Sequence, residues 1–246
     1  MSSPPRSSSI KRPDPRNAHS PVPSGPLLRS RASKSSPSAT PQQLFYSLKK
    51  EIVATNGPAY FERDGIAPET GHLVARSLCE DGDVERKSVT ISYNPISLVL
   101  SIKMPTVAHE AVQEWVISEV KVKTLLTGFF SVGELDSIFI LGPRRYDSFP
   151  PPWNNIYKEP DVAITFAGVP LPMIAVEVGY TESWPKLLRD RDLWIIGGAP
   201  HVNAVLLVKW NLRKNNHVAG YLELHRPGVA NPPRLVSIKK LFELFW

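Results

Sequence analysis

Residues 158–179 read KEPDVAITFAGVPLPMIAVEVG, two runs of alternating apolar residues on either side of a turn rich in glycine and proline. Alternation with a period of two is typical of a β-strand with one buried face, and glycine and proline mark turns. The stretch therefore predicts a β-hairpin. If the hairpin is symmetric about Val169, Asp161 and Glu177 lie directly opposite each other.

The alternation divides the hairpin into two faces. One face is apolar throughout and is predicted to lie in the core: Val162, Ile164, Phe166, Ile174, Val176 and Val178. The other face carries both acids among mostly small residues: Asp161, Ala163, Thr165, Met173, Ala175, Glu177 and Gly179. Directly opposite residues bring their Cβ atoms to about 5 Å, where two carboxylates repel unless a cation lies between them. The small neighbours predict the floor of an open cleft, and the alternative is a solvent-facing strand pair with two unrelated acids.

Pro160-Asp161, a strand, and a second hydrophobic strand ending in Glu177-Val178-Gly179 resemble the PD-(D/E)XK nuclease superfamily. Over about residues 88–210, the order of elements is most similar to the Uma2-like restriction-endonuclease branch, known in bacteria, and to uncharacterised fungal relatives. The resemblance implies an α/β fold with a central mixed sheet flanked by helices. It also implies phosphodiester cleavage, with Asp161 and Glu177 holding Mg²⁺ (or Mn²⁺) that activates a water.

The resemblance also implies a lysine two residues after the glutamate, and here that position is Gly179. The first substitute is Lys186, at the start of a helix predicted after the hairpin, because it lies on the margin of that helix's apolar stripe. Lys209 and Lys158 are further substitutes. An ordinary solvated lysine is the alternative for Lys186.

A helix predicted from His109 to about Leu126 could supply a third metal ligand. Glu119 falls within the apolar stripe of this helix, where a carboxylate needs a partner. Glu110 lies at the helix start beside His109, where an acid also favours the helix dipole. Both acids stay candidates for the metal site.

Composition narrows the class of protein. The 246 residues are 42% hydrophobic, which suits one domain with extensions. The single cysteine, Cys79, excludes an intramolecular disulfide and a zinc finger, and favours a reducing intracellular compartment. The sequence has no apolar run long enough to cross a membrane and no hydrophobic secretion signal.

Residues 1–41, rich in Ser and Pro, are predicted to form a disordered tail. They carry seven basic residues and one acid, so their net charge equals the +6 of the whole chain. Such a tail can bind phosphate backbones or carry a nuclear import signal. A mitochondrial presequence is the alternative, although the prolines oppose the helix that import needs. We expect a nuclear location and a nucleic-acid partner, DNA in particular.

The rest of the chain is assigned to two regions. Residues 42–87 are predicted to hold one helix, ending near Thr55, and then an irregular segment. Residues 88–246 are predicted to form the nuclease-like domain. Its remaining elements are a hairpin at 89–102, a strand at 131–141, a strand at 202–208 and a C-terminal helix at 235–246.

The leading function is Mg²⁺-dependent phosphodiester hydrolysis, that of a DNA endonuclease. Asp161 and Glu177 would be the metal ligands, Glu119 or Glu110 a third ligand, and Lys186 the surrogate lysine. The alternative is a catalytically inactive nuclease-like fold that acts as a nucleic-acid or protein interaction module. A structural protein without any site is a third possibility.

Overall fold

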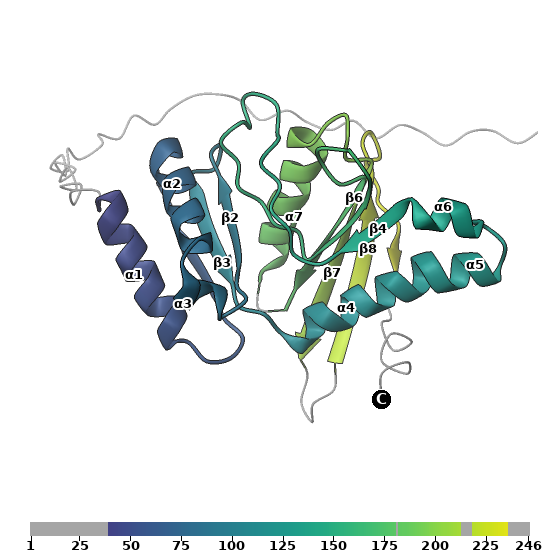
Figure 1. The fold of residues 1–246 in the computed structure, drawn as a ribbon, viewed down its shortest axis with the longest axis horizontal. Helices are drawn as coiled ribbons and strands as arrows, with labels where there is room; N and C mark the ends of the chain where they lie inside the picture. Colours follow the sequence, from purple (N-terminus) through teal and green to yellow (C-terminus); the bar gives the residue numbers. More distant parts are fainter. Residues whose placement is uncertain (1–38, 181, 213–217, 236–246) are drawn as a thin grey trace, which may run out of the picture. The chain divides into compact units, whose positions relative to one another are not determined.

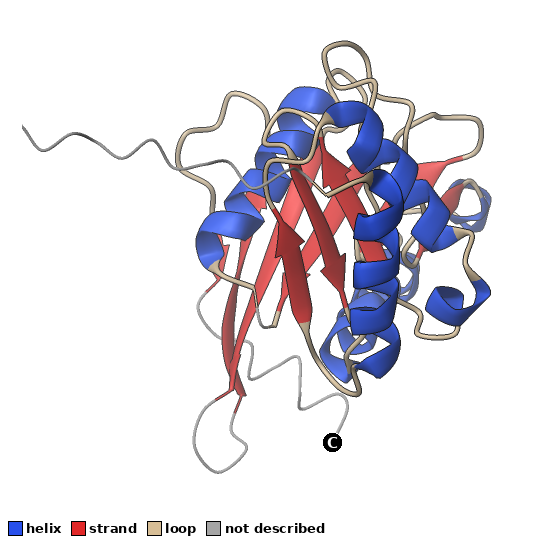
Figure 2. Ribbon diagram, turned by 90° about the vertical axis from the view of Figure 1, so that its left-hand side faces the viewer, coloured by secondary structure: helices blue, strands red, loops and turns tan. Residues whose placement is uncertain are grey.

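The computed structural model describes residues 39–180, 182–212 and 218–235 (Figure 1). Within these ranges the chain forms two β-sheets with helices packed on their faces, which confirms the predicted mixed α/β class (Figure 2). The tail predicted at 1–41, apart from its last three residues, and the C-terminal helix predicted at 235–246, apart from its first residue, lie outside the described residues. No helix among the described residues is both long and apolar enough to cross a membrane.

The strands are β1 (Tyr60–Arg63), β2 (Thr90–Asn94), β3 (Val99–Lys103), β4 (Ile138–Leu141), β5 (Val162–Phe166), β6 (Ile174–Gly179), β7 (Ala204–Leu212), β8 (Val218–His225) and β9 (Arg234–Leu235). The helices are α1 (Pro41–Ala54), α2 (Pro68–Cys79), α3 (Gly82–Glu85), α4 (Val107–Ile117), η1 (Ser118–Lys123), α5 (Thr124–Leu126), α6 (Val132–Asp136), α7 (Trp184–Asp192) and η2 (Leu193–Gly197), where η marks a π-helix.

The three-stranded sheet is antiparallel in the order β1-β3-β2. Its β2–β3 pair is the hairpin predicted at 89–102, with Thr90 opposite Lys103. Helix α1 is predicted almost to the residue, and it begins with a capping box between Thr40 and Gln43. Because β1 pairs with β3, this sheet spans the boundary predicted at 87/88.

The prediction of an irregular segment after Thr55 is wrong, since this part of the chain contains β1, α2 and α3. The buried residues of α2 recur at helical spacing: Gly71, Val74, Ala75 and Leu78. Glycine within a helix lowers its propensity, which hides this pattern in the sequence. Gly71 is nonetheless required, because a Cβ there would lie 2.1 Å from the ring of Tyr93.

The six-stranded sheet has the order β4-β5-β6-β7-β8-β9, and β6–β7 is a parallel pair, with α7 and η2 in the connection between them. Strands β5 and β6 form the predicted hairpin, and Val162 pairs with Val176. The predicted symmetry about Val169 is therefore confirmed. Gly168 takes a positive φ of 80° in the turn, a conformation that favours glycine.

Helices α4, η1 and α5 form the long helix predicted from His109, and Gly128 ends it with a φ of 68°. The strand predicted at 131–141 is wrong in its first half. Residues 132–136 form α6, which begins with a capping box between Ser131 and Glu134. This Ser-x-x-Glu pattern is the signal that identifies the helix. In Figure 1, α5 and α6 lie next to each other and form an arm beyond β4.

Candidate functional site: a buried cluster of carboxylates and lysines

The two faces of the β5–β6 hairpin meet different surroundings. The apolar face packs on α4 and β7, and its core contains Val112, Val116, Val162, Val176, Val178, Val208 and Trp210. The face with the two acids packs against α7 and η2. Asp161 and Glu177 are therefore interior residues, with 4% and 0% of their surface exposed.

The ammonium group of Lys103, at the end of β3, lies among the oxygens of this face. Lys103 Nζ is 2.8 Å from Asp161 Oδ2, 3.1 Å from Glu182 Oε1 and 3.9 Å from Glu177 Oε2. It also donates a hydrogen bond of 3.2 Å to the carbonyl of Val178. The predicted convergence of Asp161 and Glu177 is thus observed, around a lysine rather than an open space.

The other oxygen of Glu177 has two partners. Trp194 Nε1 donates to Glu177 Oε1 at 2.7 Å, and Lys158 Nζ lies 2.9 Å from the same atom. Lys158 also contacts Asp190 Oδ1 at 3.1 Å, and Lys186 donates to Asp190 Oδ2 at 2.8 Å. We call these seven charged side chains the acid–lysine cluster: Lys103, Lys158, Asp161, Glu177, Glu182, Lys186 and Asp190.

Burial and charge shift the pKa values of the cluster in opposite directions. Burial raises the pKa of Glu177 and of Glu182 to about 7, against the effect of the nearby lysines. Burial also acts to raise the pKa of Asp161 and Asp190, but Lys103 and Lys158, respectively, are the main groups that hold these pKa values below the usual range. The pKa of Lys103 lies well above its ordinary value because three carboxylates outweigh its burial. Lys103 is therefore expected to be protonated at neutral pH.

The prediction that small residues form the floor of an open cleft is wrong. Ala163 and Ala175 are fully buried in the same core as Leu187 and Trp194. Their small size admits α7 and η2, not a ligand. Gly179 has the same role, because a Cβ there would lie 2.6 Å from Leu187 Cδ1. At the position where the resemblance implies a lysine, Leu187 of α7 therefore packs directly against the backbone.

The other predicted site residues are placed as follows. Lys186 is 6% exposed and belongs to the cluster through Asp190, while Lys209 donates to the carbonyls of Gly179 and Tyr180. Glu119 bonds Trp115 Nε1 and Lys123 on its own helix.

Glu110 is exposed, and among the described residues no hydrogen bond or ion pair joins it or Glu119 to the cluster. His109, which precedes Glu110, does approach the cluster, with its Nε2 3.8 Å from Asp161 Oδ1. Burial lowers the pKa of His109.

The residues of this site do not fit a divalent metal ion in the arrangement observed. No group of three or more His, Cys, Asp or Glu side chains in the described ranges is arranged to hold one. Two oxygens of the cluster are buried without a hydrogen bond, which can mark a missing ligand: Glu182 Oε1, which is an ion-pair partner of Lys103, and Glu177 Oε2. However, the point that this oxygen faces is taken by the ammonium of Lys103. Bound Mg²⁺ would require Lys103 to leave.

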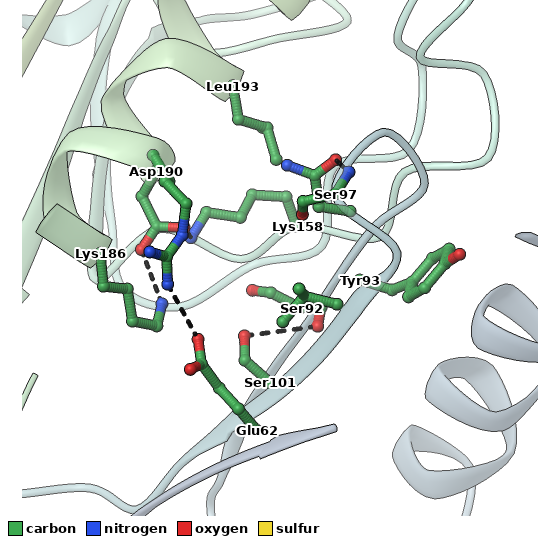
Figure 3. Close-up of a pocket in the computed structure, with 12 residues that line it drawn as sticks. Glu62, Ser92, Tyr93, Ser97, Ser101, Lys158, Lys186, Asp190 and Leu193 are labelled. Carbon is green, nitrogen blue, oxygen red and sulfur yellow. Dashed lines mark hydrogen bonds and ion pairs between the residues drawn. The ribbon is translucent and has the colours of Figure 1, made fainter. Parts of the chain in front are cut away.

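A small cavity borders the cluster on the side of the three-stranded sheet (Figure 3). Its volume of ≈ 20 Å³ holds about one water molecule. Lys158, Lys186 and Asp190 reach it from one side, and Glu62 and Ser101 from the other. Glu62 accepts from Arg189 at 3.4 Å. The cavity is too small for a nucleotide.

Sequence reasoning missed Lys103, Glu182 and Asp190. Lys103 ends a strand 58 residues before Asp161, and no local spacing connects them. Glu182 and Asp190 precede and follow the start of α7, where they resemble ordinary helix-end and helix-surface acids. The Lys158-Glu159-Pro160-Asp161 motif contained the one usable signal, because Lys158 and Asp161 both point into the cluster.

Comparisons with protein-family models, curated proteins and solved structures give no match to this chain.

Proposed function

We propose that this chain is a nuclease-like fold without metal-dependent catalysis, and that it acts as an interaction module. The absence of metal-dependent catalysis is inferred from the position of Lys103 Nζ, which lies 2.8 Å from Asp161 Oδ2 and 3.1 Å from Glu182 Oε1. A positive charge already balances the oxygens that would bind Mg²⁺. A buried carboxylate paired with an ammonium has little to gain from a second cation.

Burial supports the same proposal. Phosphodiester hydrolysis needs the metal, the attacking water and the phosphate to meet at one point. Glu177 is fully buried, and the adjoining cavity admits about one water molecule. A phosphodiester therefore has no route to the acids in this conformation.

The resemblance to PD-(D/E)XK nucleases is supported by the order of elements around the cluster. A helix (α4), three antiparallel strands (β4, β5, β6), a second helix (α7) and a parallel strand (β7) follow one another. The hairpin register pairs Val162 with Val176, which agrees with the position of Asp161 opposite Glu177 that the symmetry about Val169 predicts. This order supports the resemblance in fold, and it does not by itself predict activity.

The interaction surface that we propose is the α5–α6 arm. Large apolar side chains on this arm and on the adjoining η1 and β4 face solvent, with these exposed fractions: Val122 49%, Leu125 45%, Leu126 79%, Phe129 73%, Val132 63% and Phe139 41%. Six such residues within 18 positions form a patch that single surface hydrophobics do not explain, and contiguous apolar patches mark protein interfaces.

The occupant that we propose is a second copy of this chain. Lys121 and Lys123 flank Val122 in η1, and α6 carries Glu134 and Asp136. In a two-fold arrangement the same surface meets itself, so the lysines of one copy can face the acids of the other. The described residues hold 18 Lys and Arg and 21 Asp and Glu, a balance that favours this pairing over nucleic acid on the folded part.

The test of catalysis is incubation of the full-length chain with plasmid and single-stranded DNA in Mg²⁺ or Mn²⁺. We expect no cleavage above that of Asp161→Ala and Glu177→Ala. Metal-dependent cleavage by the wild type that both substitutions abolish would overturn the proposal, and would establish the hydrolase that the resemblance implies.

The test of self-association is light scattering of the full-length chain across a range of concentrations. We expect a dimer that Leu126→Glu and Phe129→Ser both dissociate without loss of helical content. Exposed Leu73→Ser on α2 is the matched control and should leave the dimer intact. A monomer at all concentrations overturns the proposed occupant. The chain ending at Leu235 is measured in parallel, because dimerisation that is lost with residues 236–246 assigns the contact to that segment.

Nucleic-acid binding is the second candidate, and the charge of the tail favours it. Residues 1–38 hold seven Lys and Arg and one Asp. Binding through such a segment is independent of sequence and falls steeply with salt. Replacement of all seven by Gln in the full-length chain should abolish retention of DNA in a gel-shift assay, whereas retention unchanged by this replacement contradicts the candidate. The same tail supports a nuclear location.

A further inference from the structure

We propose that the cavity between β4 and the β5–β6 turn binds a small organic carboxylate, a molecule with an apolar body and one negative charge. The inference goes beyond the proposed function, since it adds a small-molecule ligand to a chain proposed to bind a protein. The cavity has a volume of ≈ 570 Å³. Sites for small organic molecules measure about 300–1,000 Å³, so this cavity, unlike the one beside the acid–lysine cluster, admits such a ligand.

The cavity lies at the turn end of the β5–β6 hairpin. It is lined by residues of β4, the end of β5, the turn that follows β5, and the segment 144–148. Thr165, which belongs to the lining, comes four residues after Asp161, and four residues of extended chain span about 13 Å. The proposed site is therefore separate from the acids at which the resemblance implies a metal.

The lining supplies apolar surface for the body of the ligand. Four large apolar side chains contribute to it: Phe139, Leu141, Phe166 and Val169. Phe139 is 41% exposed and Val169 is 38% exposed, so both keep surface that a ligand can cover. Removal of apolar surface from water is the main driving force for binding in cavities of this kind. Two of the four side chains are aromatic, which suits a ligand with a flat ring system.

Arg144 supplies a positive charge for the carboxylate. It is exposed, and in the described part of the chain no hydrogen bond or ion pair joins its side chain to another residue. The second arginine of the lining, Arg145, lies 3.3 Å from Asp147 Oδ2 and over the ring of Tyr157. Two arginines and one aspartate give the lining a net charge of +1. A guanidinium binds a carboxylate through two parallel hydrogen bonds, so Arg144 matches a ligand with one negative charge.

Tyr146 adds a hydroxyl group whose hydrogen-bonding capacity is unused. Tyr146 lines the cavity, and its hydroxyl oxygen is buried without a hydrogen-bond partner among the described residues. Burial raises the pKa of this hydroxyl, and the charge of Arg144 acts in the opposite direction, which places the two groups near each other. Backbone hydrogen bonds to Lys158 and an edge-on ring contact with Trp194 hold Tyr146 in place. A carboxylate bound by Arg144 is a suitable acceptor for this hydroxyl.

The experiment titrates the full-length chain with naphthalene carboxylate and with naphthalene carboxamide, which has the same rings but no charge. Calorimetry and ligand-observed NMR measure the Kd. We expect one carboxylate per chain and roughly tenfold to 100-fold weaker binding of the amide, which is the effect of losing a charge-assisted hydrogen bond. Naphthyl phosphate is the third probe. It should bind less tightly than the carboxylate, because its second negative charge meets Asp147 rather than another unpaired cation.

Four variants assign the site. Arg144→Gln should weaken binding of the carboxylate to the level of the amide and leave binding of the amide unchanged. Arg226→Gln is the matched control, because Arg226 is also exposed and lies outside the lining. Tyr146→Phe should weaken binding of the carboxylate without lowering Tm, since the lost hydroxyl has no partner among the described residues. Leu126→Glu, which should dissociate the proposed dimer, should leave binding unchanged, so the dimer and the site can fail separately.

Each result supports or overturns the proposal. Preference for the carboxylate over the amide that Arg144→Gln removes and Arg226→Gln keeps supports it. No binding of the carboxylate, or equal binding of the carboxylate and the amide, overturns it. Binding that is unchanged in both Arg144→Gln and Tyr146→Phe, with circular dichroism showing both variants folded, also overturns it. Tighter binding of naphthyl phosphate than of the carboxylate overturns the assignment to carboxylates and gives the cavity to phosphate monoesters.

Discussion

The two faces of the β5–β6 hairpin are about equally buried around Asp161 and Glu177, but one is stabilised by apolar packing and the other by ion pairs. On one face Val162, Val176 and Val178 meet other apolar side chains and are all 0% exposed. On the opposite face Asp161 and Glu177 are just as deeply buried, and lysines from other segments neutralise them. The same strands thus support a non-directional core on one side and a directed charge network on the other. The charged side should respond far more sharply to single changes.

The largest effect is expected for Lys158→Met, which removes the ammonium between Glu177 and Asp190. Among the lysines of the cluster, Glu177 then keeps only the more distant Lys103, at 3.9 Å, as an ion-pair partner and Asp190 keeps only Lys186, so the free energy of unfolding should fall by about 3–5 kcal/mol. Urea denaturation measures the change. Lys49→Met breaks exposed ion pairs with Asp81 and Asp83 and should cost less than about 1 kcal/mol. Similar losses for the two variants would remove the distinction between a buried and a surface lysine.

Truncating a buried side chain on the apolar face should lower the free energy of unfolding by less than Lys158→Met does. Val176→Ala deletes two methyl groups from a fully buried position, which costs about 2–3 kcal/mol. This loss should be the same at pH 5.5 and at pH 8, because no titratable group is involved. Urea denaturation at both pH values checks this, and a pH-dependent loss would mean that the two faces are coupled.

The same comparison shows what the sequence could predict. The apolar face follows from the period of two alone, and the register follows from the position of the turn about Val169. The charged face does not, because Lys103 comes from another sheet and Asp190 from a helix one connection away. Burial of small residues is equally ambiguous: Ala163 and Ala175 suit an open floor and a close-packed helix alike. Long-range packing, not local propensity, decides between them.

The charged face should also make stability depend on pH. The pKa of Glu177 and of Glu182 is about 7 in the folded chain and near 4.5 when unfolded, so the folded state binds more protons between these values. The resulting stabilisation is present below about pH 4.5 and is lost as the pH rises towards 7. We expect these two glutamates to contribute about 1–3 kcal/mol more to the free energy of unfolding at pH 5.5 than at pH 8, against an opposite contribution from His109, whose pKa burial lowers.

Glu177→Gln tests the origin of this dependence. Glutamine can still accept the hydrogen bond from Trp194, but it cannot titrate. The variant should therefore show a flatter pH profile in urea denaturation, and Glu177→Gln with Glu182→Gln the flattest. An unchanged profile in the double variant would place the titrating groups elsewhere.

A smaller effect is expected at Gly179, where the two interpretations of the site differ. Gly179→Ala places a methyl group against Leu187, so over-packing should cost about 1–2 kcal/mol. Leu187→Ala costs stability by itself. The loss of the double variant should be smaller than the sum of the two single-variant losses, since the two residues share one contact. Simple additivity, measured by urea denaturation, would show that α7 does not depend on glycine at this position.

The smallest effect is expected for Glu119→Gln, which separates the helix surface from the cluster. Glu119 is one third exposed on its side chain, and its partners Trp115 and Lys123 are each one turn away on the same helix. Exposed pairs at this spacing contribute a few tenths of a kcal/mol, and glutamine keeps the bond from Trp115. We therefore expect a change within about 0.5 kcal/mol and an unchanged pH profile. A loss comparable to that of Lys158→Met would mean that Glu119 acts with the acid–lysine cluster, and the boundary between the two faces would then have to be redrawn to include α4.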